Sequence, residues 1–373
     1  MNNFVEFWES LGFNKFFLIL GAVLFICHVI FLIYRCVLLL KKQERGNNEE
    51  GVSVIMTCSN KAELLRENLV AYLEQDYPSF EVIIVDECSE DETQHVLSDF
   101  QKQYPHLRTT RIFPDTKFRR TKKIAINIGV LAATYDILLF AEINARPESK
   151  NWVRSMQSYF DRDTAVVLGY ANYKCSKGSS IRRYFRFLRF WKNLMMVQHG
   201  IHVMGNGYNM GYRKKFYLEK RGFSGNTQEF IGYDSEMVKE LSKKGAVKVI
   251  KDKEARMMID DNSLKSWKDD CSYYYATKRR WPWYALVLSN ADFVVEAFLY
   301  ILLFYFVVFN EFHKYFIIPV VLLFLIDLIV INICLKHLGL KKLFLTSLTV
   351  TGLGFVYKWY YSIYSIFTGK KWR

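Results

Sequence analysis

The sequence lacks several signatures that would assign a chemistry directly. Its seven cysteines are an odd number and include neither a C-x-x-C pair nor a Cys/His ligand spacing. This argues against a disulfide framework and against a structural zinc site. No G-x-G-x-x-G follows the first predicted strand, and no P-loop is present. A dinucleotide site or an ATP site is therefore unsupported.

Acidic residues are also scarce. Of 373 residues, 37 are Asp or Glu and 51 are Lys or Arg, so the net charge is +14. In a soluble protein such basicity would suggest nucleic acid as a partner. However, 51% of the residues are hydrophobic and the mean hydropathy is zero, which is too apolar for a charged soluble enzyme. A mean hydropathy of zero therefore indicates apolar segments beside charged ones. The high hydrophobic content also excludes a disordered chain.

Long apolar runs lie at both ends of the chain. Residues 16–40 form a run of the length that crosses a bilayer. A cleaved signal peptide is the alternative, but such peptides have shorter apolar cores and a basic start. Because Glu6 and Glu9 precede this run, we expect a retained transmembrane helix. Residues 282–336 contain two more apolar runs and are predicted to form a transmembrane hairpin.

Basic residues indicate the orientation, since they collect at the cytoplasmic ends of spans. Lys41 follows the first span and Arg280 precedes the second. Both lie on one side of the membrane if the short tail of residues 1–15 is outside and residues 41–281 are cytoplasmic. Residues 337–373 end in a basic tail and are expected to be re-entrant or interfacial. We therefore predict an integral protein of a bacterial-type inner or cell membrane with three spans, and residues 343–367 are the alternative for a fourth.

The segment of residues 41–281 is predicted to be an α/β domain. Short β-branched runs alternate with stretches whose apolar residues have helical spacing, which is typical of a mostly parallel sheet covered on both faces. The predicted strands are 52–56, 81–85, 108–112, 136–140 and 165–168. The predicted helices are 61–72, 92–100 and 121–133. In such sheets, ligands bind at the carboxyl ends of the strands.

Five groups of motifs in this segment follow one another in a characteristic order. They are QDYP with VDECSEDET, TKKIAINIG with FAEIN, GNGYNMGYRKKF, GYDSEMVKEL and TKRRW. From about residue 52 to residue 281 the chain thus resembles the family 2 glycosyltransferases. The resemblance implies a GT-A fold, a nucleotide-sugar donor and a lipid-linked or polysaccharide acceptor, and the flanking spans suit membrane-bound members.

The resemblance assigns three residues to the donor. It places Asp86 on the nucleotide side, with Glu87 beside it, and it directs Lys122 toward the donor phosphates. Carboxylates at strand ends suit the nucleoside part of such a donor. The plainer alternatives are a loop or N-cap aspartate for Asp86 and a solvated helix lysine for Lys122.

The metal motif departs from the family pattern. Where the family has D-x-D, this chain has Glu142, Ile143 and Asn144. Glu142 can still ligate a cation through oxygen, whereas Asn144 offers a neutral carbonyl oxygen in place of a carboxylate. The resemblance implies a divalent cation, Mg²⁺ or Mn²⁺, at Glu142 and Asn144. With one negative charge lost, the cation affinity should fall, most of all for Mg²⁺.

Two further motifs carry the predicted catalytic residues. Tyr233-Asp234 replaces Glu-Asp, and the resemblance makes Asp234 the base that takes the proton of the acceptor hydroxyl. The alternative is a helix N-terminal aspartate that complements the dipole. Thr277 replaces a Gln, while Arg280 and Trp281 are retained. Arg280 would stabilise the leaving diphosphate and Trp281 would stack on the acceptor sugar; a membrane interface would favour the same cluster.

A basic helix is predicted within the domain. Arg182, Arg186 and Arg189 fall on one helical face, which predicts contact with anionic lipid headgroups. Binding of these arginines to nucleic acid is not expected, since no recognition-helix motif accompanies them. Asp327, within the third span, is expected to pair with Asn332 or His337 or to mark a polar path.

The leading hypothesis is a membrane-anchored inverting glycosyltransferase. It would move a sugar from a cytoplasmic nucleotide sugar to a lipid-linked or polysaccharide acceptor. Three spans are too few for a wide polymer channel, so single or few transfers are expected unless a partner subunit completes a pore. The alternative is a catalytically degenerate scaffold or regulatory subunit, motivated by Asn144, Tyr233 and Thr277.

Overall fold

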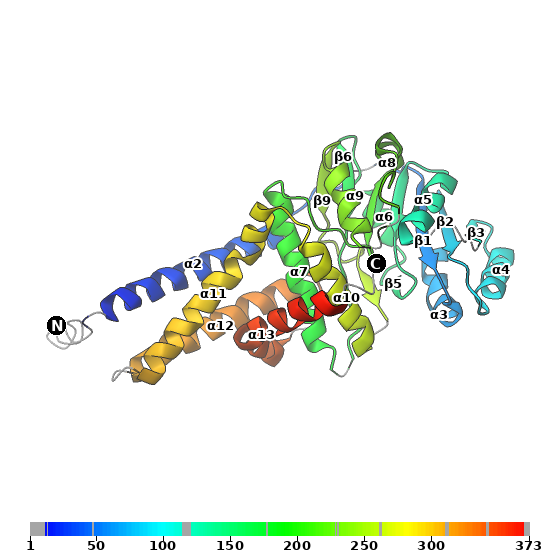
Figure 1. Cartoon of the computed structure of the whole chain (residues 1–373). Helices are drawn as coiled ribbons and strands as arrows, with labels where there is room; N and C mark the ends of the chain where they lie inside the picture. The colour runs from blue at the N-terminus through cyan, green and yellow to red at the C-terminus, as the bar shows by residue number, and fades with distance from the viewer. Residues whose placement is uncertain are drawn as a thin grey trace. The chain divides into compact units, whose positions relative to one another are not determined.

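The computed structural model describes residues 12, 14–46, 48–113, 121–176, 178–227, 229, 231–260, 263–309, 313–340 and 343–368. Most of the predicted tail of residues 1–15, and the basic end of the chain, lie outside these residues. The chain forms two compact units, both drawn in Figure 1. One comprises residues 1–41 and 282–360, and the other comprises residues 42–281 and 361–373.

The second unit is built on a seven-stranded sheet with the strand order β3-β2-β1-β4-β8-β6-β9. Its strands are β1 (Val52–Cys58), β2 (Phe80–Asp86), β3 (Leu107–Arg111), β4 (Ile137–Phe140), β6 (Thr164–Leu168), β8 (Met210–Arg213) and β9 (Ala246–Val249). All pairs are parallel except those of β8, which runs antiparallel to both β4 and β6. The predicted mostly parallel sheet is confirmed, and each of the five predicted strands occurs.

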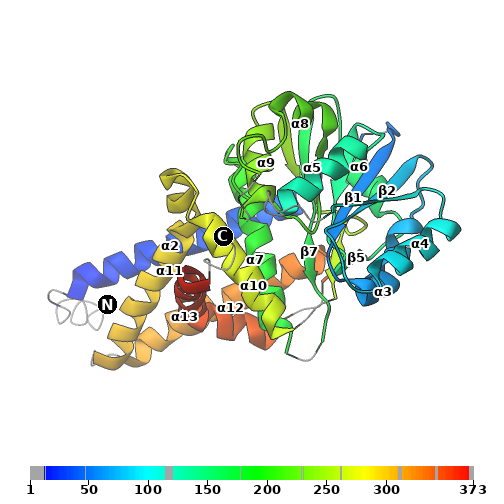
Figure 2. The same cartoon turned by 45° about the vertical axis from the view of Figure 1, so that its right-hand side comes forward.

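The central strands are buried on both faces, which explains their composition. Every residue of β1 is buried, as expected for an apolar strand that helices cover from both sides. Helix α5 (Lys122–Ala132) approaches β1 closely at Gly129, where an added Cβ would lie 2.6 Å from Cγ2 of Ile55. Figure 2 shows α5 on one face of the sheet and the adjacent helices α3 (Ala62–Leu73) and α4 (Thr93–Gln103) on the other.

A buried carboxylate connects the start of three strands. Glu81 accepts hydrogen bonds from Oγ of Ser53 at 2.7 Å and from the backbone N–H of Thr134 at 2.6 Å. It also pairs with Arg108 of β3 at 2.9 Å. Burial alone would raise the pKa of Glu81, but these hydrogen bonds hold it below its ordinary value. The Glu81 carboxylate therefore joins β1, β2 and β3 at the edge of the sheet that lies away from the predicted site.

Smaller elements complete the unit. A three-stranded sheet has the order β5-β10-β7. Its strands are β5 (Ala145–Pro147), β7 (Ala171–Tyr173) and β10 (Met257–Ile259). The remaining helices are α6 (Trp152–Gln157), α7 (Ser180–Gln198), α8 (Lys214–Lys220), α9 (Tyr233–Leu241) and α10 (Leu264–Lys278).

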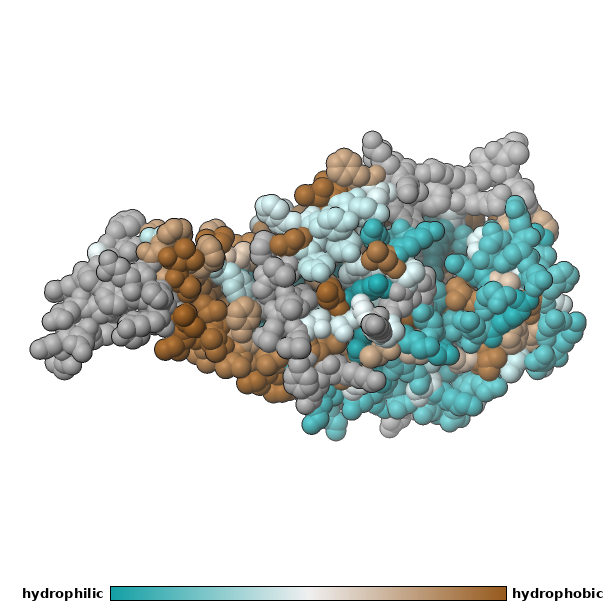
Figure 3. Space-filling model, turned by 90° about the horizontal axis from the view of Figure 1, so that it is seen from below, coloured by the Kyte–Doolittle hydropathy of each residue, from teal (hydrophilic) through white to brown (hydrophobic). Residues whose placement is uncertain are grey.

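The first unit consists of long apolar helices. They are α2 (Asn14–Leu40), α11 (Trp283–Phe309), α12 (His313–His337) and the first part of α13 (Phe344–Thr368). Three of them, α2, α11 and α12 over residues 15–40, 283–309 and 317–337, are long and apolar enough to cross a membrane. Hydrophobic side chains gather over this helical unit in Figure 3. Many of the large hydrophobic side chains of α2 and α11 are exposed.

Polar residues within these helices pair with one another. His28 of α2 contacts Asp327 of α12 at 2.9 Å, and Arg35 of α2 contacts Asp292 of α11 at 2.9 Å. The expected pairing of Asp327 with Asn332 or His337 is wrong, because the partner comes from another helix. Ionisable groups inside a membrane are expected to pair in this way, since an unpaired charge is costly there.

Residues 344–368 form one continuous helix, α13. The predicted re-entrant or interfacial placement of residues 337–373 stays a prediction. The last turns of α13 pack along α10: Trp267 donates a hydrogen bond to the Tyr361 hydroxyl at 2.7 Å, and Arg279 donates to Oγ of Ser365 at 2.6 Å.

Candidate active site

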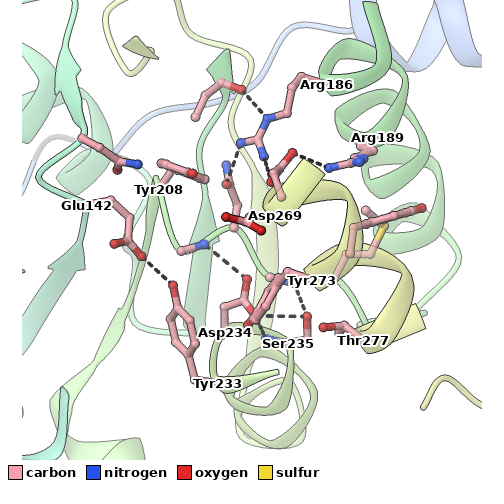
Figure 4. Close-up of a pocket in the computed structure, with 18 of the residues that line it drawn as sticks. Glu142, Arg186, Arg189, Tyr208, Tyr233, Asp234, Ser235, Asp269, Tyr273 and Thr277 are labelled. Carbon is pink, nitrogen blue, oxygen red and sulfur yellow. Dashed lines mark hydrogen bonds and ion pairs between the residues drawn. The ribbon is translucent and has the colours of Figure 1, made fainter. Parts of the chain in front are cut away.

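A cavity of about 500 Å³ opens at the carboxyl ends of β4 and β6, a size typical of small-ligand sites. Several predicted site residues line it, together with aromatic side chains that the sequence does not identify as ligand contacts. The predicted residues are Lys122, Glu142, Asn144, Asp234 and Trp281, and these further aromatic residues include Tyr170, Phe190, Tyr208, Tyr273 and Tyr274. Figure 4 shows side chains from α7, α9, α10 and the segment after β4 directed toward one space.

The predicted base lies at the start of α9, held by hydrogen bonds. Asp234 is buried; its Oδ1 accepts from the Tyr273 hydroxyl at 2.7 Å and from the Ser235 N–H at 2.8 Å, and its Oδ2 accepts from the Gly207 N–H at 3.3 Å. Burial raises the pKa of Tyr273 well above its usual value, so this hydroxyl stays a donor. The Asp234 carboxylate is thereby held in one orientation beside the cavity (Figure 4), and its role as a base stays a prediction.

A second cluster joins Glu142, Lys122 and Tyr233. The Lys122 ammonium pairs with Oε1 of Glu142, and the Tyr233 hydroxyl donates to the same oxygen at 2.7 Å. The ammonium also lies 5.0 Å from the centre of the Tyr233 ring, a cation–π contact. Burial raises the pKa of Tyr233, which keeps its hydroxyl protonated. Tyr233, which stands where the Glu-Asp motif has its glutamate, thus stabilises the Glu142 carboxylate by a hydrogen bond.

Three residues that line the cavity each carry a buried polar atom with no hydrogen-bond partner among the described residues. These atoms are Oδ1 of Asn144, Oγ1 of Thr277 and Nε1 of Trp281. Such atoms are rare in folded proteins, and each requires an explanation. One accepts, one donates and one can do both, but all three atoms are buried, so none of them is open to a ligand in this structure.

The predicted donor residues Asp86 and Glu87 end β2 but are not among the described residues that line the cavity. Asp86 is buried and accepts hydrogen bonds from the Ser89 N–H at 2.9 Å and from Gln94 at 3.1 Å. Burial raises the pKa of Glu87. The loop therefore holds Asp86 in one orientation, and the donor role of both residues stays a prediction.

Arg280 and Trp281 differ in their placement. Trp281 is buried against the cavity, whereas the Arg280 guanidinium points to Glu229, with an N–O distance of 2.5 Å between two half-exposed side chains. Arg280 is not among the described residues that line the cavity. Its predicted contact with a diphosphate stays a prediction.

The predicted headgroup contacts of Arg186 and Arg189 are wrong. Both guanidinium groups are turned into the domain, where they share the Asp270 carboxylate of α10 at 2.9 and 2.7 Å. Arg186 also lies over the Tyr208 ring and Arg189 over the Tyr274 ring, at 4.9 and 4.3 Å. Amphipathic spacing identified the helix, but the carboxylate that attracts both arginines lies more than eighty residues away in the chain.

The predicted cation site offers few oxygen ligands for a metal ion. Glu142 is its one carboxylate, and Oε1 of that carboxylate already carries an ammonium and a hydroxyl. Asn144 contributes a neutral oxygen, and the described residues hold no group of three or more His, Cys, Asp or Glu side chains that could bind a metal. Mg²⁺ in proteins is usually held by one or two carboxylates together with substrate phosphates, and here the one carboxylate is already paired with an ammonium. These residues therefore do not fit such an ion.

Comparison with known proteins finds similarity to glycosyltransferases and to a polysaccharide synthase. Residues 53–221 match the model of Glycosyl transferase family 2. A poly-beta-1,6-N-acetyl-D-glucosamine synthase of Staphylococcus epidermidis is 31% identical over 90 residues, or 24% of this chain and 21% of that protein. A dolichyl N-acetyl-alpha-D-glucosaminyl phosphate 3-beta-D-2,3-diacetamido-2,3-dideoxy-beta-D-glucuronosyltransferase of Methanococcus voltae is 26% identical over 196 residues, or 51% of this chain and 54% of that protein.

Among solved structures, a mannosyltransferase of Pyrobaculum calidifontis, in complex with GDP-Man and Mn²⁺, aligns with a TM-score of 0.55. The alignment covers 89% of this chain and 97% of that chain at 17% identity, so it shows the fold alone. The predicted GT-A fold is confirmed. The chain spans between about a fifth and a half of the length of the curated relatives it matches.

Proposed function

We propose, on the premise that residues 53–221 belong to glycosyl transferase family 2, that this protein moves a sugar from a nucleotide sugar to an acceptor at a membrane. The names of its relatives, a polysaccharide synthase and a transferase acting on a dolichyl-linked sugar, support a polysaccharide or lipid-linked acceptor. The three apolar helices support an integral membrane protein. The topology with a cytoplasmic catalytic domain belongs to this proposal.

The cavity supports an inverting displacement. An acceptor hydroxyl gives its proton to Asp234 while its oxygen bonds to the anomeric carbon, and the bond from that carbon to the donor diphosphate breaks. The nucleoside diphosphate leaves with the electron pair, and the anomeric configuration inverts. Asp86 and Glu87 hold the nucleoside side of the donor in this scheme, and Trp281 contacts the acceptor sugar.

One observation carries the proposal. A buried carboxylate, fixed by the Tyr273 hydroxyl and two backbone N–H groups, lines the same cavity as the Lys122 side chain and several aromatic side chains. A carboxylate that serves only as a helix N-terminal residue needs no ligand-sized cavity beside it. The combination of a proton acceptor, an ammonium group and aromatic walls is suited to transfer onto a sugar hydroxyl.

The test is turnover by purified full-length protein in detergent. UDP-GlcNAc, UDP-Glc and GDP-Man are supplied in turn with a membrane lipid extract, and free nucleotide is measured. Asp234→Asn should reduce turnover by about 10²-fold or more. The matched control, Asp99→Asn, changes an exposed aspartate of α4 that pairs with Lys102 and should leave turnover unchanged.

Equal rates for wild type and Asp234→Asn would contradict the proposed base. Absence of turnover with every donor would favour the degenerate scaffold or regulatory subunit, for which Asn144, Tyr233 and Thr277 are the motivating departures from the family motifs.

A further inference from the structure

We propose that the Lys122 ammonium takes the place of the divalent cation at this site, so that a lysine neutralises the leaving nucleoside diphosphate. This inference rests on the proposed function, since it concerns the leaving group of the same reaction. It follows from charge, from contacts and from access, each seen in the described residues.

The site carries little negative charge. Glu142-Ile143-Asn144 and Tyr233-Asp234 hold two carboxylates, and the Glu142 carboxylate is already paired with the Lys122 ammonium. A diphosphate that enters this cavity therefore meets a cation that the chain itself supplies.

The contacts place the Lys122 ammonium at the Glu142 carboxylate. The Lys122 ammonium pairs with Oε1 of Glu142 and lies over the Tyr233 ring. Tyr233 is itself positioned by its hydrogen bond to that same oxygen and by close contact of its hydroxyl with Gly207. A metal ion at Glu142 would face this ammonium directly, and the two like charges would repel each other.

The ammonium remains accessible to a ligand. The Lys122 side chain is 28% exposed and lines the cavity. An ammonium has three N–H donors, and the bond to Glu142 uses one. Lys122 is also the first residue of α5, where the helix dipole adds to the attraction for an anion. During transfer the anomeric C–O bond breaks, the diphosphate gains negative charge, and Lys122 contacts its oxygens; Asp234 receives the acceptor proton.

The first test needs no donor sugar. Mn²⁺ is titrated into the full-length protein in detergent, and the free ion is followed by electron paramagnetic resonance. Wild type should show no saturable site below about 1 mM. The double variant Lys122→Met, Asn144→Asp removes the ammonium and adds a carboxylate, so it should gain one Mn²⁺ site at least about tenfold tighter.

The second test uses UDP and GDP as probes, with calorimetry in EDTA. Lys122→Met should weaken nucleoside diphosphate binding about tenfold or more, Lys122→Arg should retain most of it, and the exposed control Lys102→Met should bind like wild type. Thermal melts confirm that each variant is folded.

The proposal is overturned if wild type binds one Mn²⁺ in a saturable manner and Glu142→Gln abolishes that binding, or if EDTA abolishes diphosphate binding by wild type. Absence of turnover with every donor would count against the proposed function, whereas the Mn²⁺ titration decides the role of Lys122 independently.

Discussion

Gly207 lies against the hydroxyl of Tyr233, and its replacement should disturb the site without replacing a charged side chain. A Cβ at position 207 would lie 2.0 Å from the Tyr233 oxygen and 2.8 Å from Cζ, whereas real Cβ contacts essentially never fall under 3.0 Å. The φ of Gly207 lies outside the left-handed region, so alanine adds no backbone strain. The side chain of Tyr233 must therefore move by about 1 Å.

This displacement is enough to break a hydrogen bond. The Tyr233 hydroxyl lies 2.7 Å from Oε1 of Glu142, and a shift of about 1 Å would carry it beyond 3.5 Å. Loss of a hydrogen bond to a charged group, together with overpacking, should lower the free energy of unfolding by about 2 kcal/mol. For a domain of this size, that corresponds to a fall in Tm of about 4–8 °C.

The assay is thermal unfolding in detergent, followed by tryptophan fluorescence. The control is Gly21→Ala, because no atom lies within 4 Å of a Cβ built there. Gly207→Ala is also made in the Tyr233→Phe background, which lacks the colliding hydroxyl and its hydrogen bond; there the penalty should fall to about half or less. An unchanged Tm for Gly207→Ala, or an equal penalty in both backgrounds, would refute the packing described.

Two further predictions concern the base and the fold. Tyr273→Phe removes the 2.7 Å hydrogen bond to Asp234 and the acceptor of the Gly232 N–H, so turnover should fall about tenfold and the Tm should fall as well; wild-type turnover would show that the hydroxyl does not orient the base. Glu81→Gln should lower the free energy of unfolding by about 2 kcal/mol at neutral pH. Because the pKa of Glu81 is held below its ordinary 4.5, its stabilisation is present above that pH and is lost as the pH falls through the depressed pKa. The difference in Tm between wild type and Glu81→Gln should therefore narrow in acid, and a constant difference would contradict this account.

The sequence predicted the parallel half of the sheet well because its strands are continuous apolar runs. β1 and β2 are buried almost throughout, and such strands stand out between helices of amphipathic spacing. β8 escaped prediction because it has four residues, Met210–Arg213, one of them a glycine and one an arginine. Its antiparallel pairing with β4 and β6 follows from chain topology, which no local pattern contains.

Within the site, local motifs identified Asp234, Glu142 and Lys122 but not the contacts between them. The Tyr233 hydroxyl reaches Glu142 from 91 residues away, and Tyr273 reaches Asp234 from 39 residues away. Asp270 likewise draws Arg186 and Arg189 inward from a separate helix. Residue type and spacing predict chemistry at a strand end, whereas the partner of each charge depends on how distant elements pack.

The central claim is a single displacement in which Asp234 activates the acceptor hydroxyl. The most direct measurement is the anomeric configuration of the glycosidic bond in the product, determined by NMR after transfer from a donor of known configuration. The account predicts inversion, so that an α-linked donor gives a β-linked product, and predicts that Asp234→Asn forms little of it. A product that retains the donor configuration would contradict the account.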